Sequence, residues 1–200
     1  MKIYSCNIND ISEAEFRNYF DAMSSERKES TLRLQNAKKQ KSRIAADYLC
    51  RTALSDFCGI EKERIEFALS ASGKPFAVNC KACFNISHSG DHVICAVSDK
   101  EIGIDIEKIR PINPKIAEKF ACADELDYIH SKETGFFEIW TLKEAYFKCI
   151  GTGLGANIKS VSFKISENGV VCSENGFECS FISIADGYVC SVCEQITNNI

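Results

Sequence analysis

The sequence predicts an α+β fold made of two similar α/β halves. The first observation is the order of patterns along the chain: residues at helical spacing are followed by short strand-like segments twice over, with a break near residue 100. The second is size, because 200 residues of which 45% are apolar suffice for one sizeable core or two small ones. We therefore expect one compact unit with an N-terminal half over residues 1–100 and a C-terminal half over residues 101–200, although no sequence repeat marks a duplication.

The N-terminal half opens on a strand and continues into an amphipathic helix. Between Ile44 and Phe57 apolar residues recur at helical spacing, and Gly59 follows as a stop signal. From Phe67 to Ser98, short apolar segments alternate with the turn-forming stretches SGKP, NCK and HSGD. This region is predicted to be an antiparallel sheet with tight turns, in which VICAVS is the clearest strand.

The C-terminal half begins with the segment GIDIE, residues 103–107, which follows the turn DKE as a further strand. The stretch RPINP then interrupts the sheet, and helices are expected over residues 113–150. In FFEIWTLKEAYFKCIG large apolar residues and charges alternate at helical period, and the segment stops at Gly151, a natural C-cap. Three or four short strands from Val161 to Val192 complete this half.

The charge pattern favours a small phosphate-bearing ligand over a nucleic acid. The net charge is −4, yet eight basic residues lie between Glu26 and Arg51, Arg51 included. A long nucleic acid requires a basic surface overall, whereas one local basic patch suits a phosphate group. The alternative is a solvated helix face with ordinary ion pairs, such as Asp47 with Arg51.

The chain shows no export or membrane segment. The N-terminal stretch MKIYSCNIND lacks a long apolar run, and no stretch approaches the length of a membrane span. We expect a cytoplasmic protein that binds neither membrane nor nucleic acid. Most of its 12 cysteines are then interpreted as small buried hydrophobic residues.

Two cysteine pairs have the spacing of zinc hooks, Cys80 with Cys83 and Cys190 with Cys193. The second pair lies in a predicted strand, where residues three apart face opposite sides and do not share one ion. The pattern argues against zinc, but a zinc-stabilised interaction module without chemistry of its own is the alternative from a different functional class.

The strand GIDIE places two carboxylates on one face. Ile104 and Ile106 share one face, so Asp105 and Glu107 share the other. Two like charges on a half-buried surface either raise a pKa or require a cation. The alternative is an edge strand with a solvated polar face.

The helix predicted over residues 137–150 supplies a third acid. Trp140, Glu144 and Lys148 are four residues apart and line one face. The other side is apolar and comprises Ile139, Leu142, Tyr146, Cys149 and Ile150. Glu144 and Lys148 by themselves could be an ordinary i,i+4 ion pair. Together with the two strand carboxylates they offer three oxygen ligands, which suits Mg²⁺ shared with substrate phosphates. A metal-dependent phosphohydrolase using the same acids is a third possibility.

The stretch FNISHSGD gathers Ser87, His88 and Ser89 at the end of a strand. His88 can be a core histidine, a general base or a phosphate ligand. A nucleophilic dyad with Cys95 is weakly supported, because Cys95 lies mid-strand among apolar residues that keep it a thiol. The glycines of GTGLG, residues 151–155, do not fit a nucleotide-binding loop, since they follow a helix instead of a strand.

Four segments taken in order resemble the surfactin-type 4′-phosphopantetheinyl transferases. They are GKP at 73–75, FNISHS at 84–89, GIDIEKIRP at 103–111 and WTLKEAYFKCIGTGL at 140–154. The resemblance implies a pseudo-two-fold monomer with the active site in the cleft between its halves. It also implies an enzyme that moves the phosphopantetheine arm of coenzyme A to a serine of an acyl or peptidyl carrier protein, with Mg²⁺, and releases adenosine 3′,5′-bisphosphate.

The resemblance also implies roles for individual residues. The expected Mg²⁺ ligands are Asp105, Glu107 and Glu144. The residues expected to contact coenzyme A are Lys148, Ser87 and His88 at the phosphates, Lys74 and Pro75 at the adenine, and Lys28 and Arg43 at the 3′-phosphate. The proton acceptor for the carrier serine is assigned to Glu144, directly or through a metal-bound water, with Glu107 as the alternative.

Overall fold

The computed structural model describes residues 1–155 and 157–196 and contains helices and strands in both halves. The N-terminal half comprises β1 (Lys2–Asn7), α1 (Glu13–Asp21), α2 (Ser25–Leu32), α3 (Ala37–Cys58), β2 (Phe67–Leu69), β3 (Pro75–Ala77), β4 (Cys83–Ser89) and β5 (His92–Ser98). The C-terminal half comprises β6 (Ile102–Lys108), a 3-10 helix (Pro114–Lys119), α4 (Ala123–Ser131), α5 (Gly135–Ile150), β7 (Phe163–Ser166), β8 (Gly169–Cys172), β9 (Phe177–Phe181) and β10 (Tyr188–Gln195).

The strand order is the same in both halves. The three-stranded antiparallel sheet of the N-terminal half has the order β1-β5-β4, and that of the C-terminal half has the order β6-β10-β9. The last strand of each half, β5 or β10, thus lies in the middle of its sheet. A separate hairpin accompanies each sheet, β2-β3 or β7-β8, and one long helix covers it, α3 or α5. This repetition confirms the predicted α+β fold of two similar halves.

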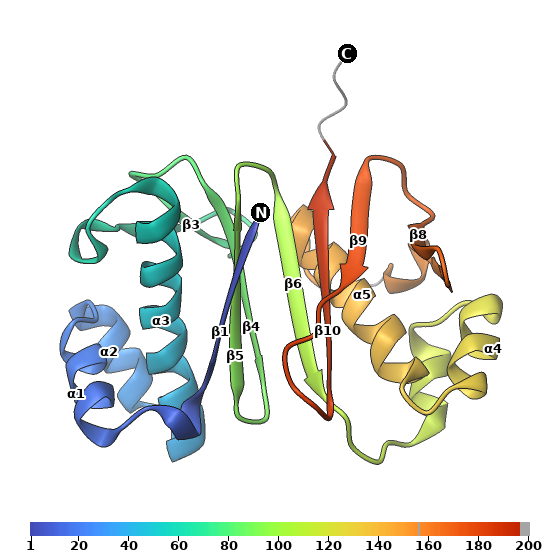
Figure 1. The fold of residues 1–200 in the computed structure, drawn as a ribbon, viewed down its shortest axis with the longest axis horizontal. Coiled ribbons are helices and arrows are strands. Elements are labelled where there is room, and N and C mark those ends of the chain that lie inside the picture. The colour runs from blue at the N-terminus through green and yellow to red at the C-terminus, as the bar shows by residue number, and fades with distance from the viewer. Residues whose placement is uncertain (156, 197–200) are drawn as a thin grey trace.

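The halves pack sheet against sheet, with the long helices outside (Figure 1). Alternate residues of β5 divide between two cores: Val93 and Cys95 pack against α3, whereas Ile94 faces the other sheet. There it meets Ile104 and Ile106 of β6. Burial of each such side chain contributes about 1.5–3 kcal/mol. The isoleucines of GIDIE therefore anchor β6 between the sheets, as predicted, and leave its acids on the opposite face.

The long helices end where the sequence predicts. Gly59 and Gly151 both adopt the left-handed conformation, with φ of 70° and 75°, which glycine adopts without steric cost. The start of α3 differs from the prediction: the helix begins at Ala37, because Asn36 accepts a hydrogen bond from Lys39 and caps it there. Its first turns are polar and carry no apolar stripe, so hydrophobic spacing does not reveal them.

The cysteines only partly follow the prediction. Six of the free cysteines are buried, as expected for small hydrophobic residues: Cys50, Cys95, Cys149, Cys179, Cys190 and Cys193. Cys80, however, forms a disulfide with Cys58 and is unavailable as half of a zinc hook. Cys190 packs between the sheets while Cys193 packs toward α5, so the second pair faces opposite sides as predicted.

Over the described residues, no helix combines the length and the apolar character needed to cross a membrane.

Candidate active site

Asp105 is a buried carboxylate on β6, with 5% of its surface exposed. Its Oδ1 accepts hydrogen bonds from Lys148 Nζ at 2.5 Å and from Ser87 Oγ at 2.7 Å. Its Oδ2 is buried and has no hydrogen-bond partner among the described residues. Burial raises the pKa of Asp105 in spite of the lysine, because removal from water outweighs the attraction of one ammonium group. The site therefore holds an acid with one oxygen still to be satisfied.

Gly103 explains how α5 comes close enough to reach this acid. It lies two residues before Asp105 on the same face of β6, and a Cβ atom there would stand 1.9 Å from the carbonyl oxygen of Ala145 and 2.4 Å from the nitrogen of Cys149. Only a glycine permits this approach of strand and helix. The close packing brings Glu144 and Lys148 of α5 beside the strand.

Glu144 is half-buried and lies one helical turn before Lys148. Burial raises the pKa of Glu144 to about 7; the charge of Lys148 opposes the rise, and those of Asp105 and Glu107 add to it. These charges show that the three predicted acids share one region of the structure. A carboxyl group with a pKa near neutrality can accept and release a proton at physiological pH.

Glu107 points from the same face of β6 and is held by two donors. Ser89 Oγ donates to its Oε2 at 2.9 Å, and Arg110 Nη1 donates to the same oxygen at 2.9 Å. The acid pair of the strand is thus anchored from β4 by serines, Ser87 on Asp105 and Ser89 on Glu107.

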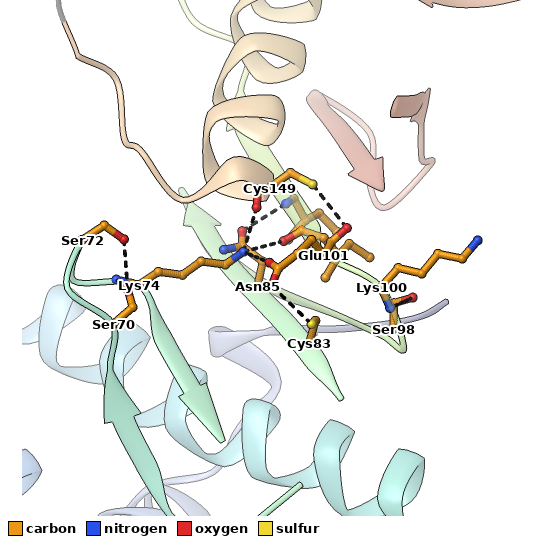
Figure 2. A network of polar contacts seen from close by, with 11 residues as sticks. Ser70, Ser72, Lys74, Cys83, Asn85, Ser98, Lys100, Glu101 and Cys149 are labelled. Atoms are coloured by element: carbon orange, nitrogen blue, oxygen red, sulfur yellow. Dashed lines mark hydrogen bonds and ion pairs between the residues drawn. The ribbon is translucent and has the colours of Figure 1, made fainter. Parts of the chain in front are cut away.

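Lys74 joins the N-terminal hairpin to the end of α5 (Figure 2). Its Nζ donates to Cys149 O at 2.9 Å and forms an ion pair with Glu101 Oε2 at 2.7 Å. A cation near the last carbonyls of a helix is favoured by the helix dipole. Lys74 therefore fixes the position of the β2-β3 hairpin relative to α5, and Pro75 continues directly from it into β3.

The donor chemistry of these residues fits Mg²⁺. Within residues 1–155 and 157–196, no group of three His, Cys, Asp or Glu side chains converges as a preformed metal site. Instead Lys148 neutralises Asp105 and Arg110 neutralises Glu107. Among the described residues Asp105 Oδ2 has no hydrogen-bond partner, and burial together with the neighbouring acids disfavours the ionised form of Glu144. A hard divalent cation bound here would offset both effects. The same finding gives the zinc-module alternative no support in this part of the chain.

Comparison with known proteins identifies the family. Residues 101–193 match the family model of the 4′-phosphopantetheinyl transferase superfamily, and residues 10–100 match that of the N-terminal part of 4′-phosphopantetheinyl transferases. The 4′-phosphopantetheinyl transferase gsp of Aneurinibacillus migulanus is 36% identical over 201 residues, which cover 95% of this chain and 84% of the relative. The chain belongs to this family. The resemblance carried by the four motifs is confirmed, and the protein is a transferase.

A second relative agrees with this assignment. The 4′-phosphopantetheinyl transferase Sfp of Bacillus subtilis (strain 168) is 33% identical to this transferase over 181 residues, covering 87% of this chain and 81% of the relative. Among solved structures, the holo-[acyl-carrier-protein] synthase of Helicobacter pylori in complex with coenzyme A aligns with a TM-score of 0.40 at 21% identity, covering 46% of this chain and 96% of that chain.

A cavity of about 360 Å³ lies in the N-terminal half of the transferase, between α2, α3, the β2-β3 hairpin and β4. Pro75 and Gly73 of the GKP motif line it, together with Phe84 and Ile86 of β4. Arg27 lines the cavity as well and lies 3.6 Å from the buried carboxylate of Asp47. The cavity therefore combines apolar walls with a cation at its rim.

The two basic residues predicted from the N-terminal segment lie in different surroundings. Lys28 does not line this cavity; its Nζ donates to Asp21 O at 2.8 Å. Arg43 donates to Ser30 O at 3.2 Å, and its charge contributes to a lowered pKa of His88. Desolvation, followed by the charge of Lys148, lowers the pKa of His88, so the imidazole is neutral at pH 7.

Four residues of this site were missed by sequence reasoning. The patterns assign Gly103 only to a strand, Arg110 to a stretch that ends the sheet, and Ser89 to a polar group at a strand end without a role of its own. Arg27 differs from Lys28 by one position in α2, and helical phase alone decides which of them faces the cavity. A search for small residues flanking the acids of GIDIE could have found Gly103, because glycine inside a strand marks a close backbone approach.

Proposed function

We propose that this transferase moves the 4′-phosphopantetheine arm of coenzyme A to a serine hydroxyl of an acyl or peptidyl carrier protein in the presence of Mg²⁺. The observation that carries the proposal is the buried Asp105, whose Oδ2 has no hydrogen-bond partner within residues 1–155 and 157–196, while Lys148 and Glu144 lie beside it. The serine oxygen forms a bond to the phosphorus that carries pantetheine. The phosphoanhydride bond breaks, and adenosine 3′,5′-bisphosphate leaves.

Asp105, Glu107 and Glu144 would hold Mg²⁺, which supplies neutralising charge for the pyrophosphate when bound. Lys148 reaches from α5 to Asp105 and lies where its ammonium group can also contact phosphate oxygens. Ser87 donates to Asp105 from β4, and the neutral His88 beside it can donate a hydrogen bond to a phosphate. The positive charge and the hydrogen-bond donors of these groups would stabilise the negative charge that develops on the leaving group.

Glu144 is proposed as the proton acceptor for the carrier serine. Burial raises its pKa to about 7 in the metal-free protein. The charges of Asp105 and Glu107 contribute to that value, so a cation bound among the three acids would lower it and favour the ionised form. Glu107 is the weaker candidate, because Ser89 and Arg110 already occupy its Oε2.

The cavity between α2 and the β2-β3 hairpin is proposed to receive the nucleotide end of coenzyme A. Pro75 provides an apolar wall for the adenine, and Lys74 fixes the hairpin that carries it. Arg27, one of two arginines that line the cavity, is proposed for the 3′-phosphate together with Arg43. Lys28 is not proposed to contact the nucleotide, because its ammonium group donates to Asp21 O and the residue does not line the cavity. In this proposal the nucleotide end of coenzyme A would occupy the cavity of the N-terminal half, residues 1–100, and its pyrophosphate would reach the acids of the C-terminal half, residues 101–200.

The reaction is tested by the intact mass of an apo acyl carrier protein after incubation with this transferase, coenzyme A and Mg²⁺. The expected result is a gain of one phosphopantetheine, which is lost with EDTA and with a carrier whose acceptor serine is alanine. Release of products from coenzyme A without any change in the carrier would instead support the phosphohydrolase alternative. No gain on fatty-acid, polyketide and peptide carriers alike would contradict the proposal.

We further propose that the transferase acts as a monomer in the cytoplasm, since one chain supplies both sheets, the cavity and all three acids. Light scattering coupled to size-exclusion chromatography tests the monomer, and a dimer mass at micromolar concentration would contradict it.

A further inference from the structure

Strands β4 and β6 lie side by side at the boundary between the halves, yet they belong to different sheets. Each is an outer strand of its own sheet, β4 in β1-β5-β4 and β6 in β6-β10-β9. An outer strand leaves a row of backbone groups that require partners when they are buried.

Three alternate residues of β4 each form a hydrogen bond with a group on β6. Asn85 Oδ1 accepts from the backbone nitrogen of Ile104 at 3.0 Å. Ser87 Oγ donates to Asp105 at 2.7 Å. Ser89 Oγ accepts from the backbone nitrogen of Lys108 at 3.0 Å. Side chains of β4 thus take the place of a backbone ladder between the two strands, and they set the position of β6 along β4.

Ser89 differs from Asn85 and Ser87 because it contacts both the backbone and a side chain of β6. While its oxygen accepts from the Lys108 backbone, its hydroxyl donates to Glu107 Oε2 at 2.9 Å. One hydroxyl therefore ties the carboxylate of Glu107 to the backbone of the next residue. All hydrogen bonds to the carboxylate of Glu107 among the described residues reach Oε2, which leaves Oε1 available to a ligand.

We propose that Ser89 is a positioning residue, which holds Glu107 by Oε2 so that Oε1 is presented to the divalent cation and the coenzyme A pyrophosphate. This inference rests on the proposed function. A carboxylate that is held by an outer hydrogen bond loses less conformational freedom when it binds a metal, and removal of such a bond typically weakens metal affinity about 10- to 100-fold. A residue that only joins the two halves would change stability and leave cation affinity unaltered.

Ser98 provides a matched control. It lies at the end of β5, is fully buried, and donates to Glu194 of β10, so it too joins the two sheets by a serine-to-glutamate hydrogen bond. Glu194 is not one of the three acids of the site. Ser98→Ala therefore removes the same kind of contact between the same halves without touching Glu107.

The experiment measures Mn²⁺ binding by electron paramagnetic resonance in the presence of coenzyme A, alongside the urea midpoint, for the full chain and its variants. Ser89→Ala is expected to weaken Mn²⁺ binding about tenfold, Ser89→Thr to restore it to within about threefold, and Ser98→Ala to leave it unchanged. If Ser89→Ala does not fold, the nearly isosteric Ser89→Cys takes its place, because a thiol is a poor substitute for the hydroxyl.

Two results would overturn the inference and differ from each other. If Ser89→Ala bound Mn²⁺ within twofold of the wild type, or if Ser98→Ala weakened Mn²⁺ binding as much as Ser89→Ala does, Ser89 would be only a structural contact. The proposed function would then still stand. A wild-type chain that binds no Mn²⁺ in the presence of coenzyme A would remove the metal role itself, together with this inference.

Discussion

Lys148 and Asp105 form the ion pair that connects α5 to β6 across the candidate active site, with Nζ 2.5 Å from Oδ1. The carboxylate is almost fully buried, whereas the lysine keeps 27% of its side-chain surface exposed. The lysine thus compensates a charge that the protein has removed from water. The same ammonium group lies 3.2 Å from Ser87 Oγ, so strand, helix and β4 meet at one point.

Replacement of this lysine is expected to separate stability from activity. Lys148→Met should abolish transfer and, in EDTA, lower the free energy of unfolding by about 1–3 kcal/mol, because Asp105 remains buried without its cation. The double variant Lys148→Met/Asp105→Asn should recover most of this loss in urea unfolding and remain inactive. Equal stability of the single and double variants would show that the pair does not compensate charge.

The pKa of Glu144 predicts a pH-dependent stability. Its folded-state pKa of about 7 lies above the ordinary 4.5, so the folded state binds the proton more tightly, and this contribution is lost as pH rises through 7. Glu144→Gln should therefore match the wild type below pH 4.5 and exceed it by about 1–2 kcal/mol above pH 8 in EDTA, a range that allows for partial exposure. Urea unfolding at four pH values measures the difference.

Glu138 on the same helix is the control with the opposite sign. Burial acts against ionisation there, but hydrogen bonds from Lys132, Tyr128 and Thr134 prevail and lower the pKa of Glu138. Its stabilising contribution is present above the ordinary pKa and is lost as pH falls through the lowered one. Glu138→Gln should thus be the less stable protein at pH 8. The same sign for both variants would contradict the assignment at Glu144.

The acids of this site could be predicted from sequence because strand and helix periodicity are local. Alternation in GIDIE puts Asp105 and Glu107 on one face, and spacing by four aligns Glu144 with Lys148. The contacts of Ser89 with β6 could not be predicted, because they depend on two outer strands of different sheets meeting side by side. Local pattern specifies which face a residue lies on, and tertiary packing decides what that face meets.

The exposure of Ile150 shows the same limit. Helical spacing assigns it to the apolar side of α5, but 38% of its surface is exposed at the residue where the helix ends. Hydrophobic periodicity assumes that the helix is covered along its whole length, and the last turn is where this assumption fails.

Gly103 is predicted to tolerate no side chain. In Gly103→Ala the new methyl group would overlap the backbone of α5 at Ala145 and Cys149, which cannot rotate away. The cost should reach about 3 kcal/mol or more, at the upper end for overpacking, and transfer should fall because Glu144 and Lys148 shift from Asp105. Gly155→Ala is the control, since nothing lies within 4 Å of a Cβ atom there. Equal urea midpoints for the two variants would contradict this explanation.

Lys74 is predicted to affect coenzyme A binding more than stability. Lys74→Met loses the bonds to Cys149 O and Glu101, which releases the hairpin that carries Pro75. The KM for coenzyme A should rise about tenfold, the equivalent of about 1.4 kcal/mol, while kcat changes little. Lys100→Met, whose ammonium group points away from this network in Figure 2, should leave the KM unchanged. A fall in kcat alone would place Lys74 with the reacting groups instead.

The last prediction concerns Lys143, which directly precedes Glu144 and is completely buried. Its Nζ lies 3.0 Å from Glu125 of α4, itself 1% exposed, and also donates to the carbonyls of Val161 and Ile158. This buried pair connects α4, α5 and the segment before β7, and thereby sets the orientation from which Glu144 reaches β6.

Lys143→Met should cost about 3–5 kcal/mol, because it leaves the carboxylate of Glu125 buried and uncompensated. Adding Glu125→Gln should recover part of this loss, since the amide is neutral and its oxygen can still accept from the backbone nitrogen of Phe163, which now donates to Glu125 at 3.0 Å. Both variants are compared by urea unfolding at pH 7. If Lys143→Met were as stable as the wild type, the pair would not orient α5, and the position of Glu144 would have to depend on Gly103 alone.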